Sequence, residues 1–352
     1  MIRLGWAVAA VVLGLAILAV GLQAAGYDAG AALGALWNGA FGSWYAFTSA
    51  TLVRAVPLIL IGLGIAIAFR GGAFNIGAEG QFYAGAIGAT WLGLQVAGQP
   101  ALIAIPVVLV GSIVAGAAWV AVPVWLKLRF GVVEVISTLL LNFVAEALVS
   151  LLVQGPLQEH TRIYPQSDAI AESARLPLLA GTRLHAGFLL ALGASLLLWY
   201  LFSRTLWGFR LRAVGAGPRA AEVSGRIDSQ RVGAAALLCS GAMAGLAGGV
   251  EVSGISYALF QNLSPGYGFT GIAVALLGGL NPAGVFLSGT LIGALEAGAG
   301  AMQRDAGIPS VAVYIVEAVI IIVALLATTP KGGWANARVI RRIRPSMPKA
   351  TT

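Results

Sequence analysis

Apolar windows of about 20 residues recur along this chain, the length an α-helix needs to cross the ~30 Å hydrocarbon layer of a membrane. Because a spanning segment must satisfy its own backbone hydrogen bonds, such windows restrict the fold to bundled helices. They predict an all-α polytopic membrane protein of about ten transmembrane helices in one domain, residues 1–352. The predicted spans are 5–25, 50–69, 76–97, 101–125, 132–154, 184–203, 232–252, a short broken span at 264–280, 283–302 and 311–328.

The first window has a second interpretation as a signal peptide, because Arg3 precedes an apolar run that ends near Ala25. The run from Leu4 to Leu22 is long for a signal peptide. We therefore favour a retained helix.

The composition also indicates a membrane protein. Hydrophobic residues make up 59% and charged residues 10% of the chain, whereas a soluble domain carries about 25% charged residues. The net charge of +8 would suggest nucleic-acid binding in a soluble chain. Here basic loops facing the cytoplasm explain it, so we expect contact with membrane lipid and no nucleic-acid partner.

The few cysteine and histidine residues argue against a metal site. Cys239 is the single cysteine and falls in an apolar run, which excludes an intrachain disulfide or a thiolate cluster. His160 and His185 share one polar loop, where we expect both to be solvated. We predict no metal and no cofactor in this chain.

Lysine and arginine set the expected orientation. Most of the 21 basic residues fall at one side of the predicted spans, and by the positive-inside rule that side is cytoplasmic. Both termini are therefore predicted to be cytoplasmic. Residues 155–183 become an external loop, 205–230 a cytoplasmic loop and 331–352 a basic cytoplasmic tail.

A faint internal similarity links the two halves. Leu109–Ala117 in the fourth span resembles Leu291–Ala299 in the ninth, and the two spans run in opposite directions. A repeat of helices 2–5 by helices 7–10 would therefore be inverted, as in many transporters. Chance similarity between apolar helices is the alternative.

Polar residues inside apolar spans mark the candidate pathway. The stretch from Gly71 to Gly85 places Asn75, Glu79 and Gln81 among glycines. A carboxylate at a bilayer centre costs about 2.5–3.5 kcal/mol on insertion scales. We expect this segment to lie against protein or along a water-filled path.

The fifth span carries a polar residue every four positions. Glu134, Thr138, Asn142 and Glu146 drift by only about 40° per step on a helix, so they form one stripe. The stripe either lines the pathway or bonds neighbouring helices together. Glu134 lies near the predicted cytoplasmic end of the span, where simple exposure to water is a further interpretation.

A third polar region lies between Gly254 and Pro282, where a helix is interrupted. A broken helix frees backbone groups that need protein or a water-filled cavity, so this is a second candidate lining, with an ordinary external loop as the alternative before Pro265. Its polar members are Tyr257, Gln261, Asn262, Ser264, Tyr267, Thr270 and Asn281. Phe74, Phe82, Phe143 and Tyr267 are candidate apolar walls.

Small residues at helix-packing spacing have a simpler interpretation. Gly241, Gly245 and Gly249 recur every four residues in one span, as do Gly289 and Gly293 in another. They permit close backbone approach, and we expect them to pack helices.

The cytoplasmic loop at 206–230 contains a short predicted helix. Pro218 is a favoured first helical residue and Gly225 a favoured stop, which predicts a helix over 218–224. Such a helix suits docking to a partner, with a solvated connector as the alternative. Arg219 and Glu222, three residues apart, can pair with each other or with a partner's groove.

Four motifs together resemble a known family: GGAFNIGAEGQFYAGA, VEVISTLLLN, LRAVGAGPRAAEVSG and GFTGIAVALLGGLNPAGV. In this order, over roughly residues 50–330, they are similar to the permease subunits of ATP-binding-cassette (ABC) importers for nucleosides and simple sugars. Ribose and branched-chain amino acid permeases are more distantly similar. The chain departs from the family pattern at Val133 and Gly217, where asparagine is frequent.

The resemblance implies a set of partners. A homologous second permease, two cytoplasmic ATPases and an external substrate-binding lipoprotein would complete the transporter. It also implies that the loop from Arg212 to Ser224 couples the permease to an ATPase. The coupling residues carried over are Arg212, Pro218, Arg219, Ala220 and Glu222.

The residues themselves indicate that another protein supplies the energy for transport. Lys127, Lys331 and Lys349 each follow a residue other than glycine, so the chain has no phosphate-binding loop. ATP would be bound by partner subunits. No serine-elbow or HExxH spacing occurs, and neither histidine lies in the interior of a span, which argues against an enzyme and leaves no catalytic residue.

We therefore expect a multi-pass permease of the bacterial cytoplasmic membrane that moves nucleosides or related purine and sugar ligands inward by alternating access. The alternatives are an ABC permease for sugars or branched-chain amino acids, and an ion-coupled secondary transporter of a small polar solute. The ion site of the latter would use Glu79, Glu146, Glu296 or Glu317. The predicted substrate pathway is formed by Asn75, Glu79, Gln81, Asn142, Glu146, Tyr267 and Thr270.

Overall fold

The computed structural model describes residues 2–179, 181–225 and 227–309, together with the single residues 311, 314, 318 and 322. Over these residues the regular structure is helical, apart from two isolated β-bridges. In this part of the chain, six helical stretches are long and apolar enough to cross a membrane. The structure thus confirms the all-helical class, while ten spans, the sidedness of the termini and the inverted repeat stay predictions.

The helices follow the predicted spans closely. The N-terminal part contains α1 (Ile2–Ala24), α2 (Ala29–Phe41), α3 (Trp44–Ala46), α4 (Val53–Arg70), α5 (Ala78–Gln95), α6 (Ala101–Phe130) and α7 (Glu134–Val153). The remainder contains α8 (Gly187–Arg204), α9 (Leu206–Ala216), α10 (Pro218–Gly225), α11 (Ser229–Glu251), α12 (Tyr267–Leu277) and α13 (Pro282–Ala306). The predicted span at 311–328 and the tail at 331–352 lie outside the continuously described residues.

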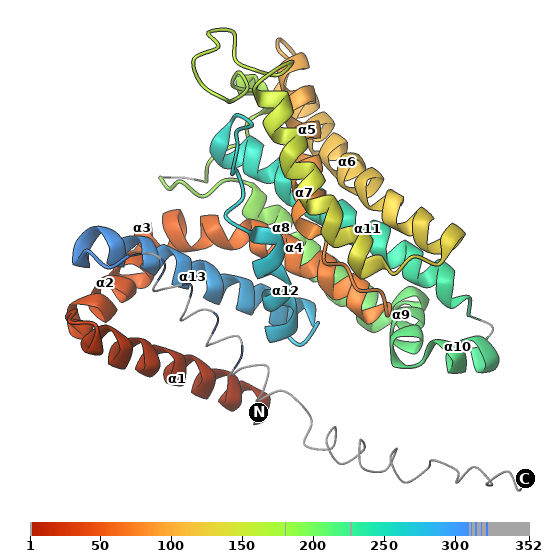
Figure 1. Ribbon diagram of the computed structural model, residues 1–352, viewed down its shortest axis with the longest axis horizontal. Coiled ribbons are helices and arrows are strands. Elements are labelled where there is room, and N and C mark those ends of the chain that lie inside the picture. Colours follow the sequence, from red (N-terminus) through yellow and green to blue (C-terminus); the bar gives the residue numbers. More distant parts are fainter. Residues whose placement is uncertain are drawn as a thin grey trace, which may run out of the picture.

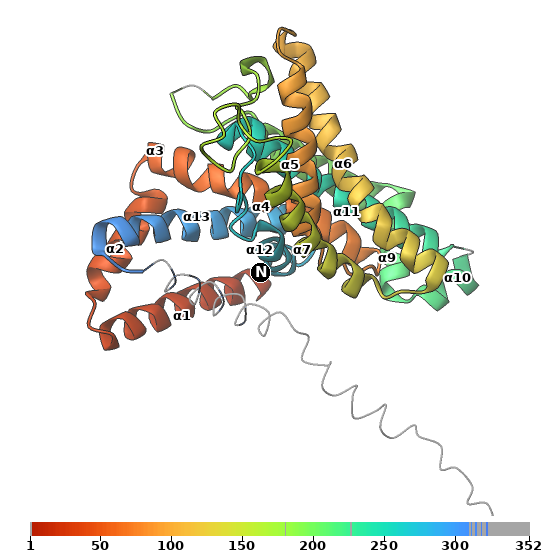
Figure 2. The same cartoon turned by 45° about the horizontal axis from the view of Figure 1, so that its top comes forward.

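Helix α4 is the centre of the bundle. Every residue from Ala55 to Ala68 is buried, as expected for a helix that is apolar on all sides. It contacts α11, α13, α12 and α8. In two views, α1, α2 and α13 lie to one side of α4 and α5, α6 and α11 to the other (Figures 1 and 2).

Glycines let α5, α6 and α11 pack backbone against backbone. A β-carbon on Gly85 would overlap the backbone of Gly245, and one on Gly116 would overlap Gly241. Small residues at such contacts are typical of membrane helix interfaces. The expected packing role of the small residues in α11 is confirmed.

Helix α2 is not among the predicted spans. Its 13 residues are too few to span a bilayer, so a search for long windows passes over it. Asp28 caps the helix by accepting a hydrogen bond from the Ala31 N–H at 3.0 Å. The helix packs on α13, where a β-carbon on Gly39 would overlap Ala301.

Two irregular segments lie between helices of the bundle. Between α4 and α5, residues 73–77 have no regular structure. Helix α11 continues as a π-helical turn, Val252–Ser256, and an irregular segment then leads to α12. The predicted break before the short span at 264–280 is therefore confirmed.

The predicted external loop packs on this irregular segment. The N–H groups of Ser167, Ile170 and Leu176 donate to the carbonyls of Leu259, Tyr257 and Ser253, each at 2.8 Å. These bonds hold the irregular segment and the predicted external loop together. The lining role of this segment stays a prediction.

The expectation that His185 is solvated is wrong. Its side chain is fully buried, and a β-carbon on Gly254 would overlap its ring. Sequence places it in a polar loop, but the loop folds back over the π-helical turn and covers it. His160 is exposed as expected.

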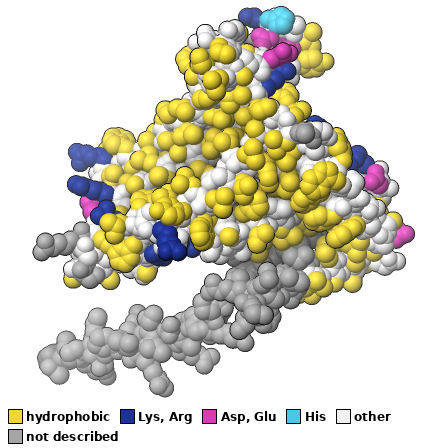
Figure 3. All heavy atoms as spheres, turned by 180° about the vertical axis from the view of Figure 1, so that it is seen from behind, with side chains coloured by type: hydrophobic (Ala, Val, Ile, Leu, Met, Phe, Trp, Pro, Cys, Tyr) yellow, Lys and Arg dark blue, Asp and Glu magenta, His cyan; other side chains and the backbone are white. Residues whose placement is uncertain are grey.

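The surface seen from behind is dominated by hydrophobic side chains, with charged groups mainly at its margins (Figure 3). Exposed tryptophan, leucine and phenylalanine side chains are numerous, for example Trp199, Leu196 and Phe209. A soluble protein does not expose apolar area on this scale. The distribution fits a protein surrounded by lipid and by other subunits.

Candidate functional site

Asn75 and Gln81 form a reciprocal amide pair at the start of α5. The Asn75 Nδ2 donates to Gln81 Oε1 at 2.8 Å, and the Gln81 Nε2 donates to Asn75 Oδ1 at 2.9 Å. Asn75 also donates to Ser240 Oγ on α11 at 2.8 Å and accepts from the Gly77 N–H at 2.9 Å. Both amides are buried, so this pair fixes the segment before α5 against α11.

Asn142 connects α7 to the same segment. Its Oδ1 accepts from the Gly80 N–H at 2.8 Å and its Nδ2 donates to the Ile76 carbonyl at 3.0 Å. Gly80 lies in the first turn of α5, whose N–H groups have no partner within the helix. Asn142 therefore acts as a cap supplied by a neighbouring helix.

Glu79 connects α5 to α12. Its carboxylate accepts a hydrogen bond from the Gly268 N–H at 2.5 Å and another from Ser264. Gly268 is in the first turn of α12, where the helix dipole favours a negative group. The side chain is 2% exposed, so Glu79 joins the starts of two interrupted helices inside the protein.

The polar stripe on α7 faces protein for three of its four members. Glu134, Thr138 and Asn142 are buried, whereas Glu146 is exposed. Glu134 is bound by Lys127, whose Nζ lies 2.7 Å from Glu134 Oε1, so simple solvation of Glu134 is not what the structure shows. The stripe thus bonds helices at one end and is exposed at Glu146.

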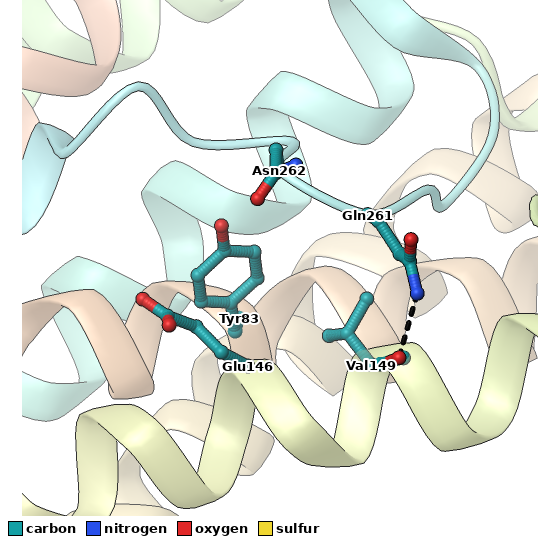
Figure 4. A pocket seen from close by; sticks show the side chains of 6 residues that line it. Tyr83, Glu146, Val149, Gln261 and Asn262 are labelled. Carbon is teal, nitrogen blue, oxygen red and sulfur yellow. Dashed lines mark hydrogen bonds between the residues drawn. The ribbon is translucent and has the colours of Figure 1, made fainter.

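A cavity of about 180 Å³ lies at this open end (Figure 4). Its walls come from α5, α7 and the irregular segment before α12. The lining residues are Tyr83, Glu146, Val149, Ser150, Gln261 and Asn262. Small-molecule sites usually enclose about 300–1,000 Å³, so this cavity would hold part of a nucleoside-sized ligand.

The structure separates the predicted pathway residues into two groups. Glu146 lines the cavity, whereas Asn75, Glu79, Gln81 and Asn142 are buried, hydrogen-bonded and not part of its lining. Tyr267 packs on Phe82, their ring centroids 5.8 Å apart. Thr270 is half-buried on α12, and Phe74 and Phe143 are exposed rather than gathered at the cavity.

The predicted pathway set did not include Tyr83, Ser150, Gln261 and Asn262. Gln261 and Asn262 belong to the broken region already recognised as a candidate lining. Tyr83 follows the conspicuous polar segment by two residues. Ser150 is one helical turn beyond Glu146, so extending the polar stripe of α7 by one step would have found it.

The short helix predicted for residues 218–224 is present as α10, Pro218–Gly225. Pro218, Arg219, Ala220 and Glu222 are exposed on it, and Ala221 is buried. Glu222 accepts a hydrogen bond from the Ser229 hydroxyl. Among the ion pairs found in the described residues, none joins Arg219 to Glu222.

Helix α9 carries α10 and is anchored to the membrane helices. Thr205 caps it by accepting from the Gly208 N–H at 3.3 Å, and Arg212 donates to the Phe202 carbonyl of α8. A β-carbon on Gly215 would overlap the Arg70 carbonyl oxygen at the end of α4. Helix α9 thus touches Arg70, the last residue of α4 before the Asn75 segment.

The predicted external loop carries an exposed acidic and histidine cluster. Hydrogen bonds from Thr161, Gln166 and the Tyr164 N–H lower the pKa of Glu159 to about 2. Asp168 accepts from the His160 ring at 2.8 Å, which raises the pKa of His160 and lowers that of Asp168. Within the described residues, no group of three or more metal-ligating side chains occurs.

Comparison with known proteins identifies the class to which these features belong. Residues 47–325 match the family described as branched-chain amino acid transport system / permease component. The chain belongs to this family of membrane permeases. No solved structure matches it.

Curated relatives cover nearly the whole chain. A guanosine ABC transporter permease of Bacillus subtilis is 40% identical over 89% of this chain and 90% of its own length. A glucose ABC transporter permease of Haloferax volcanii is 36% identical over 90% and 86%. A nucleoside ABC transporter permease of Lactococcus lactis is 34% identical over 77% of each chain.

These similarities settle the general function. The chain is a permease subunit of an ABC importer and a multi-pass protein of the cytoplasmic membrane. Its relatives are transporters rather than enzymes. In such a system ATP is used by partner ATPases.

Proposed function

We propose that this permease carries nucleosides, or related ligands that contain a sugar, into the cytoplasm. Support comes from relatives named for guanosine, for nucleosides and for glucose. Each of these cargos is neutral and hydroxylated. The lining of the cavity at Glu146 has no lysine, arginine or histidine, which suits a neutral cargo better than a phosphorylated one.

We further propose that the chain works with a second, homologous permease. Bacillus subtilis has two guanosine permeases similar to this chain, at 40% and 28% identity. Lactococcus lactis has two nucleoside permeases, at 34% and 29%. A pair of related chains per transporter would complete a cavity that one chain supplies only in part.

One observation carries the proposed mechanism: α9 contacts the α4–α5 connection directly. Gly215 abuts the backbone of Arg70, and the Arg70 guanidinium lies over the Phe202 ring, 4.7 Å from its centroid. Beyond Arg70 the chain reaches Asn75 and α5, and Glu79 joins α5 to α12. A displacement of α9 would therefore act on the interrupted helices beside the cavity.

In this mechanism ATP binding draws the two ATPases together, and α10 moves with the ATPase surface on which it is docked. Val223 is 87% exposed on α10 beside Arg219 and Glu222, a mixed apolar and charged surface suited to docking. The displacement passes through α9 to α5 and α12 and changes the side to which the cavity opens. An external binding lipoprotein would deliver the cargo.

Reconstitution of the whole transporter tests this proposal. Proteoliposomes containing both permeases and the ATPases, with the binding protein added outside, should accumulate labelled guanosine or adenosine only when ATP is inside. Uptake of glucose or leucine instead of nucleosides would assign a different cargo. Accumulation by the purified single chain under a proton or sodium gradient, without ATPases, would establish an ion-coupled transporter.

A further inference from the structure

The polar lining of the cavity at Glu146 combines one carboxylate, two hydroxyl groups and two amides. The Gln261 Nε2 donates to Ser150 Oγ at 2.6 Å, and Ser150 accepts a second bond from Gln154 Nε2 at 2.8 Å. This contact holds the amide nitrogen of Gln261 against α7 and leaves its oxygen as an acceptor (Figure 4). The two oxygens of the Glu146 carboxylate are hydrogen-bond acceptors.

Tyr83 and Asn262 line the cavity together with Glu146. The Tyr83 hydroxyl accepts from the Ser264 N–H at 3.3 Å. Asn262 has a φ of 59°, a left-handed conformation that asparagine tolerates and that is often found at ligand sites. Figure 4 shows the side-chain amide oxygen of Asn262 directed toward Tyr83. It also shows the Glu146 carboxylate beside the Tyr83 ring.

This chemistry favours one kind of ligand group. The lining lacks a cationic side chain, so a phosphate or carboxylate would leave Glu146 facing another negative charge. Two adjacent hydroxyl groups instead present two donors, which match the two oxygens of a carboxylate. The Tyr83 ring offers an apolar face for the carbon skeleton between them.

We propose that this cavity binds the vicinal hydroxyl groups of the cargo's sugar, with Glu146 as their shared acceptor. Asn262 and Gln261 complete the subsite, and Tyr83 supports the sugar ring. The proposal rests on the proposed function, because it assumes a cargo that contains a sugar. The subsite lies next to the Glu79–Gly268 bond, so movement of α12 relative to α5 would reshape it.

Uptake by the complete transporter in proteoliposomes tests the subsite. Four nucleosides are compared: guanosine, adenosine and their 2′,3′-dideoxy forms. Wild type is compared with Glu146→Gln, which preserves side-chain size but removes the ionised acceptor. Each result is expressed as the ratio of variant to wild-type uptake, so that the preference of the binding protein cancels.

We expect Glu146→Gln to lower uptake of both ribonucleosides by about tenfold, as loss of a charge-assisted hydrogen bond implies. Uptake of both dideoxynucleosides should be nearly unchanged, since they lack the two donors. Val144→Ala, an exposed change on the same helix outside the cavity lining, should leave all four ratios near one.

Two outcomes would overturn the subsite while leaving the proposed function intact. An equal loss for ribo- and dideoxynucleosides would show that Glu146 does not read the diol. A loss confined to the two guanine nucleosides would assign Glu146 to the donor edge of the base. If wild type carried none of the four nucleosides, the proposed function itself would fail.

Discussion

Gly215 of α9 and Arg70 of α4 meet backbone to backbone. A β-carbon on Gly215 would overlap the Arg70 carbonyl oxygen, and Gly72 lies just beyond, with its own β-carbon position 3.6 Å from Gly215 Cα. Contacts between backbones cannot be relieved by rotating a side chain. The position of α9 is therefore tied to the point where the chain enters the Asn75 segment.

Gly215→Ala should weaken coupling without preventing membrane insertion. The added methyl group would push α9 away from Arg70, and overpacking of this kind costs about 1–3 kcal/mol. The measurement is nucleoside transported per ATP hydrolysed in proteoliposomes. Gly217→Ala is the matched control, because its nearest neighbour would be Ala220 Cβ at 3.7 Å; equal coupling in both variants would contradict the proposed route.

Glu222→Arg should sharply lower both ligand-stimulated ATPase activity and uptake. The exposed Glu222 side chain is part of the surface proposed to dock on the ATPase, where reversal of charge is repulsive or mismatched. The Glu222 carboxylate also accepts a hydrogen bond from the Ser229 hydroxyl. Ser229→Ala removes this hydrogen bond without changing the docking surface, and so separates the two roles of Glu222. Exposed polar contacts contribute only about 0–1 kcal/mol, and we expect Ser229→Ala to retain activity. Equal damage in both variants would refute the docking role.

Asn142→Ala should reduce uptake and lower the thermal stability of the permease. The change leaves the Gly80 N–H and the Ile76 carbonyl without partners, and each unsatisfied buried group costs about 1–3 kcal/mol. Gln81→Ala should act similarly by breaking the amide pair with Asn75. Asn38→Ala, at an exposed position, is the control. Unchanged uptake and cargo preference in both buried variants would remove these residues from the pathway assignment.

The predicted orientation can be tested with single cysteines on a Cys239→Ala background. Ile163 in the outer loop is 71% exposed and Val223 on α10 is 87% exposed. In intact cells, a membrane-impermeant thiol reagent should label Ile163→Cys directly. Val223→Cys should react only after the cells are opened. Labelling of Val223→Cys from outside would reverse the topology.

The His160–Asp168 contact should weaken as pH rises. Its hydrogen bond raises the pKa of His160 above the ordinary 6.5. The stabilisation is therefore fully present below pH 6.5 and is lost as pH rises through the higher folded-state pKa. Hydrogen exchange of the 159–168 segment, corrected for intrinsic rates, should lose protection over that interval. The loss should be absent in His160→Ala.

Much of the fold follows from one local property. Apolar length predicts α4, α6, α7, α8, α11 and α13, because a segment in lipid must satisfy its own backbone. The same property misses α2, which is short and gains its stability from packing on α13. The preferences of proline for helix starts and of glycine for helix ends also predicted α10, because both preferences depend only on the local backbone.

Only part of the candidate site could be predicted from local sequence. Sequence alone determined that Asn75, Glu79, Gln81, Asn142 and Glu146 need polar surroundings, because an apolar environment penalises an unpaired amide or carboxylate. It did not determine which of them have protein partners. That depends on contacts such as Glu79 with Gly268, 189 residues apart.

Sequence by itself thus determined the membrane class, the helical windows, the motifs of the family and the polar positions, all of which depend on composition over a few turns. Tertiary structure decided that His185 is buried, that Asn142 caps a neighbouring helix, and that Glu146 alone of its stripe opens to a cavity with Asn262. The physical reason is that exposure and hydrogen-bond partners are set by where distant helices meet. These contacts between distant helices form only in the packed bundle.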